Sequence, residues 1–434
     1  MNERATTRAL ALLLVLLTVI FTLGGQASVF SALNDSTTIS TSGQIVIAPN
    51  PNVNFYTCSY SFSEYTNASV IGATYGLSQS WYAPQDTNYA ARIEQAKTAN
   101  PNYKALIYRD ISHVYNYWTD EWDTCQANGW LLKDKNGNYV VDSGYASNYY
   151  VDVGNTSYQQ WVAAKIESWL NTYTFFDGVF ADNGLFVNTA WDYYASATPI
   201  NPRTNNPFTN ADIENAFVGL ENAIKTAIGN KMLVCNGLWS GDDFYYWQAS
   251  FLDLLNRSSL DGAMAEGCWY QNGGQWETLT QWQQSLQFTS QLQSYFGNKS
   301  SGAFVQCMFV NSGVPSGANE TQMLLYGYCS ALLTAQNDRN YVGAMAETST
   351  PDTGILQLMQ SLNEISLGPA QTSYSQISGT QVYTREFQNV KVLVNPSSLT
   401  YNLQLSSQYH TLDGSVVSGS YSIAPYTGLL LFNG

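Results

Sequence analysis

The sequence predicts an α/β protein: a (β/α)8 TIM barrel followed by a small antiparallel β-sandwich domain. Short apolar runs alternate with longer segments of helical periodicity over roughly 300 residues, which is typical of parallel strands joined by helices. From about residue 370 the helical period is lost, and short alternating runs are separated by turn residues. About eight strand–helix units favour a closed barrel, and the Gly-rich first turn of a Rossmann sheet is not present.

The first 28 residues are expected to be a secretory signal peptide or an N-terminal anchor. Arg4 and Arg8 precede an apolar run at 9–23, and small residues follow it. The run is short for a membrane span of about 20 residues, which favours cleavage. Residues 29–51 are rich in Ser and Thr and are expected to form a linker. We therefore expect a secreted or surface-anchored protein, with no stable membrane domain beyond this segment.

Two further features agree with export. Six Asn-x-Ser/Thr glycosylation acceptors occur, at Asn34, Asn67, Asn155, Asn256, Asn298 and Asn319. The six cysteines are Cys58, Cys125, Cys235, Cys268, Cys307 and Cys329. None has C-x-x-C spacing, which argues against a zinc site, and some are expected to form disulfides outside the cell.

The barrel is expected to occupy residues 52–368 and the β domain residues 369–434. Between the apolar runs lie helix-like segments, one of them with Asn210 as a plausible N-cap. The expected strands are 69–77, 104–112, 148–155, 175–183, 231–239, 260–269, 302–310 and 340–348.

Composition limits the classes of function. Charged residues make up 11% of the 434 residues, and the net charge of −15 argues against a nucleic-acid partner. The phosphate-binding G-x-x-x-x-G-K-[ST] and the dinucleotide-binding G-x-G-x-x-G are missing, and no cofactor is expected. Only two histidines occur, His113 and His410, and no G-x-S-x-G elbow is present. A Ser-His-Asp hydrolase and a His-based metal site are therefore disfavoured.

A repeated pattern ends three of the expected strands. Gly, an apolar residue, a large apolar residue, Ala and a carboxylate follow one another at 178–182, 262–266 and 343–347. The strand at 104–112 carries an acid, Asp110, near its end. Counted along the chain, these are strands 2, 4, 6 and 8, and alternate barrel strands contribute to one layer of side chains. We therefore expect the acids to gather at the barrel mouth: Asp110, Asp182, Glu266 and Glu347.

The alternative for any one of these acids is a helix cap or a turn residue. Four acids in one register are harder to explain in that way. Two carboxylates that flank a glycosidic bond need no histidine, metal or cofactor, since one stays ionised and the other holds a proton as general acid. Several aromatic residues follow strand ends and could stack on the flat faces of sugars: Trp118, Phe186, Trp191, Trp239, Trp269 and Tyr270.

The segments YRDISHVY, GWLLKDKNGN, YYVDVGNTSYQQWV and FFDGVFADN, with the tail YTREFQNVKVLVNPS, resemble a family assigned as glycoside hydrolases. Its members have a TIM barrel followed by a small β domain. The FDGVFAD run is also similar, more loosely, to the α-galactosidase and α-glucosidase barrels. That resemblance implies Asp182 as nucleophile and Glu266 as acid/base, although the wider group usually has Asp at the second position.

We therefore predict a glycoside hydrolase that acts on a poly- or oligosaccharide through Asp182 and Glu266, with retention at the anomeric carbon. The residues expected to bind or orient the substrate are Asp110, Asp152, Arg109, Asn183, Asn236, Trp239, Trp269 and Glu347. Two alternatives stay open. One is a non-catalytic surface protein that binds carbohydrate, and the other is an exoprotein in which some of the acids bind calcium.

Overall fold

The computed structural model describes residues 54–59, 75–78, 87–99, 101, 103–192, 194–238, 242–271, 274–309, 314–336, 339–345 and 353–433. The expected signal segment, the Ser/Thr-rich linker, Trp239 and Glu347 lie outside these residues. The chain divides into two compact units. One spans Pro49–Ile365, and the other contains Ser366–Gly434.

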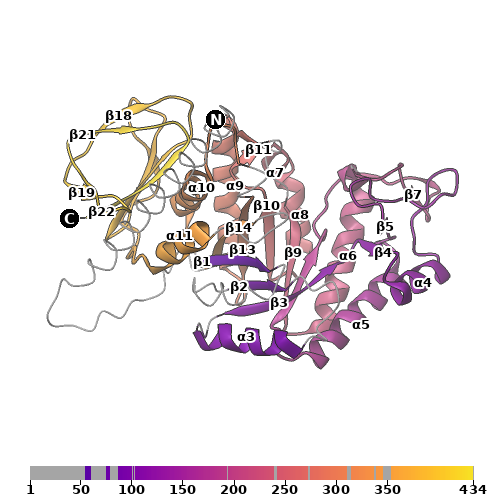
Figure 1. Cartoon of the computed structure of the whole chain (residues 1–434). Helices are drawn as coiled ribbons and strands as arrows, with labels where there is room; N and C mark the ends of the chain where they lie inside the picture. Colours follow the sequence, from indigo (N-terminus) through magenta and orange to yellow (C-terminus); the bar gives the residue numbers. More distant parts are fainter. Residues whose placement is uncertain are drawn as a thin grey trace, which may run out of the picture. The chain divides into compact units, whose positions relative to one another are not determined.

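The first unit is built on eight parallel strands that form a curled sheet (Figure 1). They are β1 (Asn54–Ser59), β2 (Tyr75–Ser78), β3 (Lys104–Asp110), β6 (Gly178–Asp182), β9 (Met232–Leu238), β10 (Gly262–Glu266), β13 (Ala303–Phe309) and β14 (Asn340–Met345). Neighbours pair in the order β1-β14-β13-β10-β9-β6-β3-β2. Because β1 also pairs with β2, the strand pairing closes on itself. The predicted parallel α/β architecture is confirmed.

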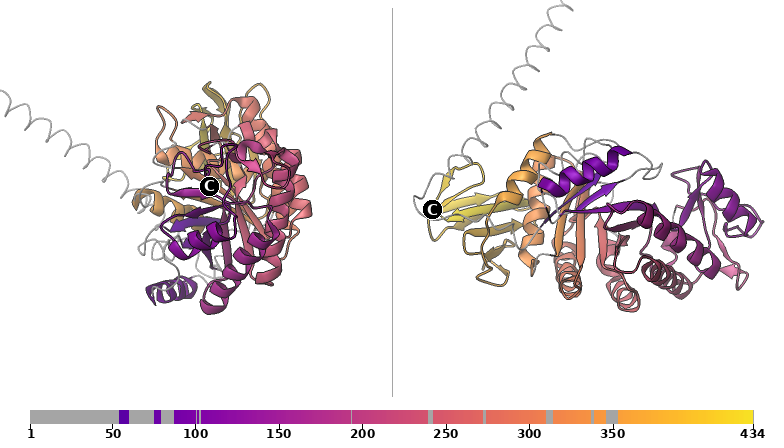
Figure 2. Two further views of the ribbon diagram at one scale, coloured as in Figure 1. Left: turned by 90° about the vertical axis from the view of Figure 1, so that its right-hand side faces the viewer. Right: turned by 90° about the horizontal axis from the view of Figure 1, so that it is seen from below.

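Helices connect these strands and pack around the sheet (Figure 2). They are α3 (Thr87–Ala99), α5 (Thr156–Thr172), α6 (Asn210–Ile228), α7 (Asp242–Tyr246), α8 (Gln248–Arg257), α9 (Leu279–Gly297), α10 (Glu320–Thr334) and α11 (Thr353–Glu364). The predicted cap of α6 is wrong by one position. Thr209, not Asn210, is the N-cap, and it forms a reciprocal capping box with Asp212.

Alternate residues of each strand fill the inside of the curled sheet, as the two-residue period of a strand requires. This cluster consists of Leu106, Tyr108, Phe180, Met232, Val234, Met264, Ala303, Val305, Cys307 and Tyr341. Asp110, Asp182, Asn236 and Glu266 lie two residues beyond members of this cluster, so their side chains continue the inner face at the carboxyl end of the strands.

The expected strand at 148–155 is not part of the parallel sheet, which is a correction to the sequence analysis. Residues Asn148–Tyr150 form β5, which pairs antiparallel with β4 (His113–Tyr115). The missing sheet strand is β1, whose short sequence NFYTCS has no continuous apolar run. An alternating run does not reveal whether its partner strand is parallel or antiparallel. The segment at 148–155 was therefore predicted as a strand of the parallel sheet in place of β1.

Residues 111–155 therefore form an insertion between β3 and α5, and we refer to them as the β3–α5 insertion. It contains β4, α4 (Thr119–Ala127) and β5, and it extends from the end of β3 (Figure 1). After β6, the short strands β7 (Ile200–Asn201) and β8 (Asn206–Pro207) form a second small sheet. Two further short strands, β11 (Tyr270–Gln271) and β12 (Gln275–Trp276), pair after β10.

The second unit is antiparallel, as predicted. A six-stranded sheet has the order β15-β16-β17-β22-β19-β20, and a two-stranded sheet pairs β18 with β21. The strands are β15 (Ser375–Gln376), β16 (Tyr383–Glu386), β17 (Val390–Asn395), β18 (Tyr401–Gln404), β19 (Tyr409–His410), β20 (Val416–Val417), β21 (Ser420–Ile423) and β22 (Thr427–Asn433). Leu393 and Leu431 of the larger sheet share a core with Leu403 and Ile423 of the smaller one.

The cysteines do not show the expected disulfides. Cys125, Cys235, Cys268, Cys307 and Cys329 are all buried free thiols. The side chain of Cys58 lies outside the described structure. Among the described helices, none combines the length and apolar character that crossing a membrane requires.

Candidate active site

Asp110 and Asp182 end two neighbouring strands. They are direct register partners on β3 and β6, so both side chains point to the inner face of the sheet. Asp110 was expected on the second strand of the barrel, two strands from Asp182. Because β1 was missed, β3 is the third strand in chain order, and the two acids are adjacent.

Asp182 accepts hydrogen bonds from three donors among the described residues. The Tyr108 hydroxyl donates to Oδ2 at 2.6 Å, and the Asn236 amide donates to Oδ1 at 2.9 Å. The backbone N–H of Asn183 also donates to Oδ1, at 3.0 Å. Burial raises the pKa of Asp182, and the negative charge of Asp110 raises it further, while these donors act in the opposite direction. Hydrogen bonds to a carboxyl group stabilise its ionised form more than its neutral form, so the three donors favour the ionised Asp182.

Asp110 is held more firmly and is only 1% exposed. Its Oδ1 accepts from the backbone N–H groups of Ser112 and His113, and the His113 ring lies 3.3 Å away. Its Oδ2 accepts from the Asn183 amide at 3.1 Å. Burial alone would raise the pKa of Asp110, but His113 and the hydrogen bonds outweigh it, and the net shift is downward. Asp110 therefore anchors the turn after β3 and positions Asn183, whose backbone has the left-handed φ of 51°.

Asn236 joins the two predicted catalytic acids. It lies on β9, between the strands of Asp182 and Glu266, and is 7% exposed. One nitrogen, Nδ2, donates to Asp182 at 2.9 Å and to Glu266 Oε2 at 2.5 Å. Because one nitrogen contacts both, these two carboxylate oxygens lie no farther apart than the sum of the two contacts, 5.4 Å. The structure thus brings Asp182, Asn236 and Glu266 into one site.

Trp269 is not placed as expected. A turn follows Glu266, in which Gly267 and Trp269 both have positive φ, of 82° and 70°. The Trp269 side chain is 3% exposed and faces Trp282 of α9, with ring centroids 6.3 Å apart. A buried indole cannot stack on a sugar, so Trp269 packs the turn after Glu266 against α9.

Arg109 does not lie in the site, where it was predicted to bind the substrate. It is next to Asp110 on β3, so its side chain points to the outer face of the sheet. The guanidinium forms an ion pair with Glu121 of α4 at 2.7 Å and lies 5.1 Å from the Trp118 ring. With 1% exposure it cannot reach a sugar, and it instead fastens the β3–α5 insertion to the sheet.

Asp152 lies in the β3–α5 insertion rather than on a sheet strand. It is 2% exposed, and both its carboxylate oxygens contact Nη1 of Arg203, at 2.9 and 2.8 Å. Arg203 belongs to the segment between β7 and β8. This ion pair joins two loops, and no described contact connects Asp152 with Asp182 or Glu266.

Three further side chains lie at the site although the sequence did not predict them there: Tyr108, His113 and Tyr115. Tyr108 is two residues before Asp110 on the same strand, so the strand period alone would have placed its hydroxyl on the inner face. His113 and Tyr115 belong to β4, after the end of β3. The backbone turn held by Asp110 brings them back toward the site, and the sequence does not reveal this turn. Trp239 and Glu347 stay predictions, since both lie outside the described residues.

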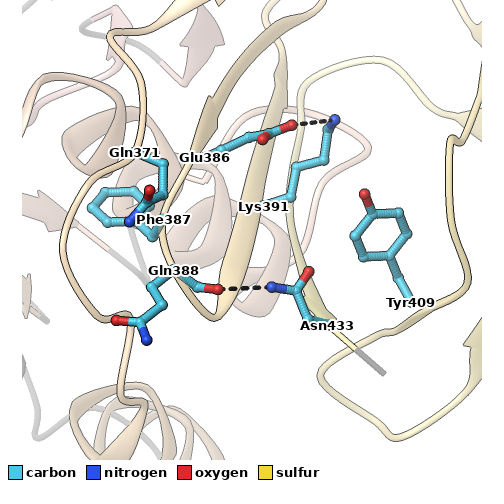
Figure 3. A pocket seen from close by; sticks show the side chains of 7 residues that line it. All are labelled: Gln371, Glu386, Phe387, Gln388, Lys391, Tyr409 and Asn433. Atoms are coloured by element: carbon cyan, nitrogen blue, oxygen red, sulfur yellow. Dashed lines mark hydrogen bonds and ion pairs between the residues drawn. The ribbon is translucent and has the colours of Figure 1, made fainter.

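A separate hollow of about 460 Å³ lies in the C-terminal unit (Figure 3). It is lined by Gln371, Glu386, Phe387, Gln388, Lys391, Tyr409 and Asn433. Its one carboxylate, Glu386, forms an ion pair with Lys391 at 2.9 Å. The hollow lacks the second carboxylate of a glycosidase site. In the described part of the chain, no group of three or more His, Cys, Asp or Glu side chains is arranged to hold a metal ion.

Comparison with known families agrees with this geometry. The model of "Hypothetical glycosyl hydrolase family 15" matches residues 97–391, which is more than half of the chain. The chain belongs to this family. This member of "Hypothetical glycosyl hydrolase family 15" is a glycoside hydrolase, and a carbohydrate substrate fits it. A search of curated proteins finds no significant relative.

Solved structures similar to this glycosyl hydrolase include Amy13B of Eubacterium rectale, with a TM-score of 0.52 and 11% identity over 89% of this chain and 97% of that one. Another is the cyclic α-maltosyl-(1→6)-maltose hydrolase of Arthrobacter globiformis, with a TM-score of 0.48 and 10% identity over 90% and 94% of the two chains. An α-amylase of Geobacillus thermoleovorans has a TM-score of 0.48 and 9% identity over 87% and 97%. At this identity, the likeness to Amy13B shows the fold alone.

Proposed function

We propose that this glycoside hydrolase cleaves bonds in a poly- or oligosaccharide with Asp182 as nucleophile and Glu266 as general acid and base. The observation that carries the proposal is the Asn236 amide, which contacts both carboxylates from one nitrogen. Retaining enzymes hold their two carboxyl groups about 5 to 5.5 Å apart, and inverting enzymes roughly 6.5 to 9.5 Å. The short separation of the two carboxylates here supports retention.

The hydrogen bonds to Asp182 also indicate which of the two carboxyl groups is the nucleophile. Tyr108, Asn236 and the Asn183 N–H favour the ionised form of Asp182, which a nucleophile requires. In the first step, Asp182 bonds to the anomeric carbon while the leaving oxygen takes the proton of Glu266. In the second step, Glu266 takes a proton from water, and the resulting hydroxide displaces Asp182 from the sugar. The two steps return both carboxyl groups to their starting states.

Two variants test these roles. Asp182→Asn should lower kcat by roughly 10³-fold or more on every substrate, because no carboxylate remains to attack. Glu266→Gln should lower kcat on natural glycans by a similar factor. It should keep much of its first step on 4-nitrophenyl glycosides, since nitrophenolate leaves without a proton. Stopped-flow and steady-state release of nitrophenol measure both.

Matched controls use exposed acids outside the site. Asp253→Asn and Glu364→Gln remove surface carboxylates and should leave kcat unchanged, and circular dichroism should show native folds in all four variants. Near-normal turnover by Asp182→Asn or Glu266→Gln would overturn the assigned role. Release of the inverted anomer by the wild-type enzyme, followed by ¹H NMR, would contradict retention.

We further propose that the fold is a complete (β/α)8 barrel and that the enzyme is exported. The closed strand pairing supports the first part, although the segment after β1 lies outside the described residues. The basic and apolar N-terminal pattern supports the second, as do exposed glycosylation acceptors at Asn256, Asn298 and Asn319. N-terminal sequencing and deglycosylation of protein from the culture medium would check export.

A further inference from the structure

Two tyrosines of the β3–α5 insertion have largely exposed side chains. Tyr117 is 48% exposed and Tyr145 is 70% exposed. Tyr117 lies two residues after β4, and Tyr145 three residues before β5. Since β4 and β5 pair with Tyr115 opposite Asn148, both tyrosines project from the same end of this two-stranded ladder. They therefore belong to one surface although they are far apart in sequence.

Hydrogen bonds hold this surface in place. Asp142 Oδ1 accepts from the backbone N–H of Tyr145 at 3.2 Å, and the Tyr145 carbonyl accepts from the N–H of Asn148 at 2.8 Å. The N–H of Asn116 donates to the carbonyl of Ser147 at 3.0 Å and ties the two turns together. Because the backbone on both sides is fixed, a ligand that contacts these rings orders little extra chain.

Tyr115 links the exposed rings to the carboxylates of the site. It lies two residues after His113 on β4, and so on the same face of that strand, and the His113 ring lies 3.3 Å from Asp110. The Tyr115 ring lies 5.1 Å from that of Tyr117. Burial raises the pKa of Tyr115, and the charge of Asp110 raises it further, followed by Tyr117, Asp182 and Tyr145. Tyr115 is thus close enough to Asp110 and Asp182, and to both exposed tyrosines, for these groups to raise its pKa.

We propose that Tyr117 and Tyr145 form a stacking platform for sugar units beyond the cleaved bond, so that the enzyme takes an extended glycan chain rather than a single terminal sugar. This inference rests on the function proposed above. The C–H faces of a pyranose are flat and apolar, and they pack on an aromatic ring while the sugar hydroxyls stay in water. Two rings held at one end of the β4–β5 ladder select a ligand that is long enough to cover them and the carboxylate pair.

The test compares a polymer with a small substrate. The probe is whichever of soluble starch, dextran, galactan or carboxymethylcellulose the wild-type enzyme cleaves fastest, paired with the 4-nitrophenyl glycoside of the same sugar. Tyr117→Ala and Tyr145→Ala should each raise KM for the polymer by about three- to tenfold, with kcat little changed. Both should leave kcat/KM for the nitrophenyl glycoside within about twofold of wild type, since one sugar does not reach the platform.

Conservative and distant variants complete the design. Tyr145→Phe keeps the ring and should have the polymer KM of the wild type. If Tyr145→Ala instead misfolded the insertion, activity on the nitrophenyl glycoside would fall as well. Tyr173→Ala removes a ring before β6, at the opposite end of that strand from Asp182, and should leave both substrates unaffected.

Three outcomes would overturn the platform: an unchanged polymer KM in both alanine variants, an equal loss on both substrates, or a wild-type enzyme that cleaves nitrophenyl glycosides but no polysaccharide of the panel. If Asp182→Asn is inactive while the platform variants behave as wild type, this inference fails alone. If Asp182→Asn is active, the proposed function fails.

Discussion

Asp110 and Asp182 show how two adjacent carboxylates acquire different properties. Asp110 is fixed by His113 and backbone N–H groups, and its pKa is lowered. Asp182 is partly buried beside that negative charge, and its pKa is raised above the ordinary value of 3.8. Catalysis by ionised Asp182 should therefore fade as the pH falls through its raised pKa. The stability that Asp110 contributes is present above its unfolded pKa and is lost only as the pH falls through its lower folded pKa.

Removing the Tyr108 hydroxyl should move the acid limb of activity. That hydroxyl donates to Asp182 at 2.6 Å and lowers the pKa of its carboxyl group. In Tyr108→Phe the pKa of Asp182 rises further, so the acid limb of kcat/KM should shift to higher pH by about one unit. A pH–rate profile on a 4-nitrophenyl glycoside measures the shift. Tyr328→Phe, which removes a buried hydroxyl of α10, should leave the limb in place; an unmoved limb in Tyr108→Phe would refute the assignment.

At the scale of elements, β3 serves two purposes through the two faces of one strand. Its inner face carries Tyr108 and Asp110 into the site, and its outer face carries Arg109 to Glu121 of α4. Lys165 of α5 reaches the other oxygen of Glu121 at 2.8 Å. The strand that contributes to the candidate site therefore also fastens the insertion that carries the exposed tyrosines.

Replacing Arg109 should be costly. Arg109→Met leaves Glu121 buried with one partner instead of two, and we expect a loss of about 3 kcal/mol in the free energy of unfolding. Lys391→Met breaks the Glu386 pair, in which Glu386 is half-exposed, and should cost less than about 1 kcal/mol. Urea denaturation followed by tryptophan fluorescence compares the two variants. Equal losses would show that the Arg109 pair does not fasten the insertion.

At the scale of the whole molecule, the described structure relies on packing rather than covalent cross-links. All five described cysteines are buried free thiols, although export was expected. Burial raises the pKa of Cys125 to about 12 and that of Cys235, Cys268 and Cys329 further, so these thiols stay protonated and unreactive at neutral pH.

Reducing agents should therefore leave stability unchanged. The melting temperature in 5 to 10 mM dithiothreitol, roughly the range that reduces accessible disulfides, should agree with that in buffer within error. Titration with a thiol reagent should detect the cysteines in urea and few of them in the native state. A fall of several degrees on reduction would show that disulfides do form.

The sequence indicated the strand ends that carry Asp182 and Glu266 because a short pattern recurred in the same register. It did not separate the run at 148–155 from a sheet strand, because the pairing partner of an alternating segment is set by distant chain. Arg109 could have been placed correctly, since neighbours on a strand face opposite sides. Trp269 could not, because its burial depends on two left-handed residues in the turn after Glu266.

The β3–α5 insertion leaves the first unit after β3 and rejoins it at α5 without interrupting the pairing of the eight parallel strands. An exposed ring of this insertion, such as Tyr117 or Tyr145, can be lost, gained or moved while the carboxylates and Asn236 keep their places. Preference for one glycan over another and the ability to break the bond can thus diverge independently, and variation in this one segment would be enough to adapt the same catalyst to a new polymer.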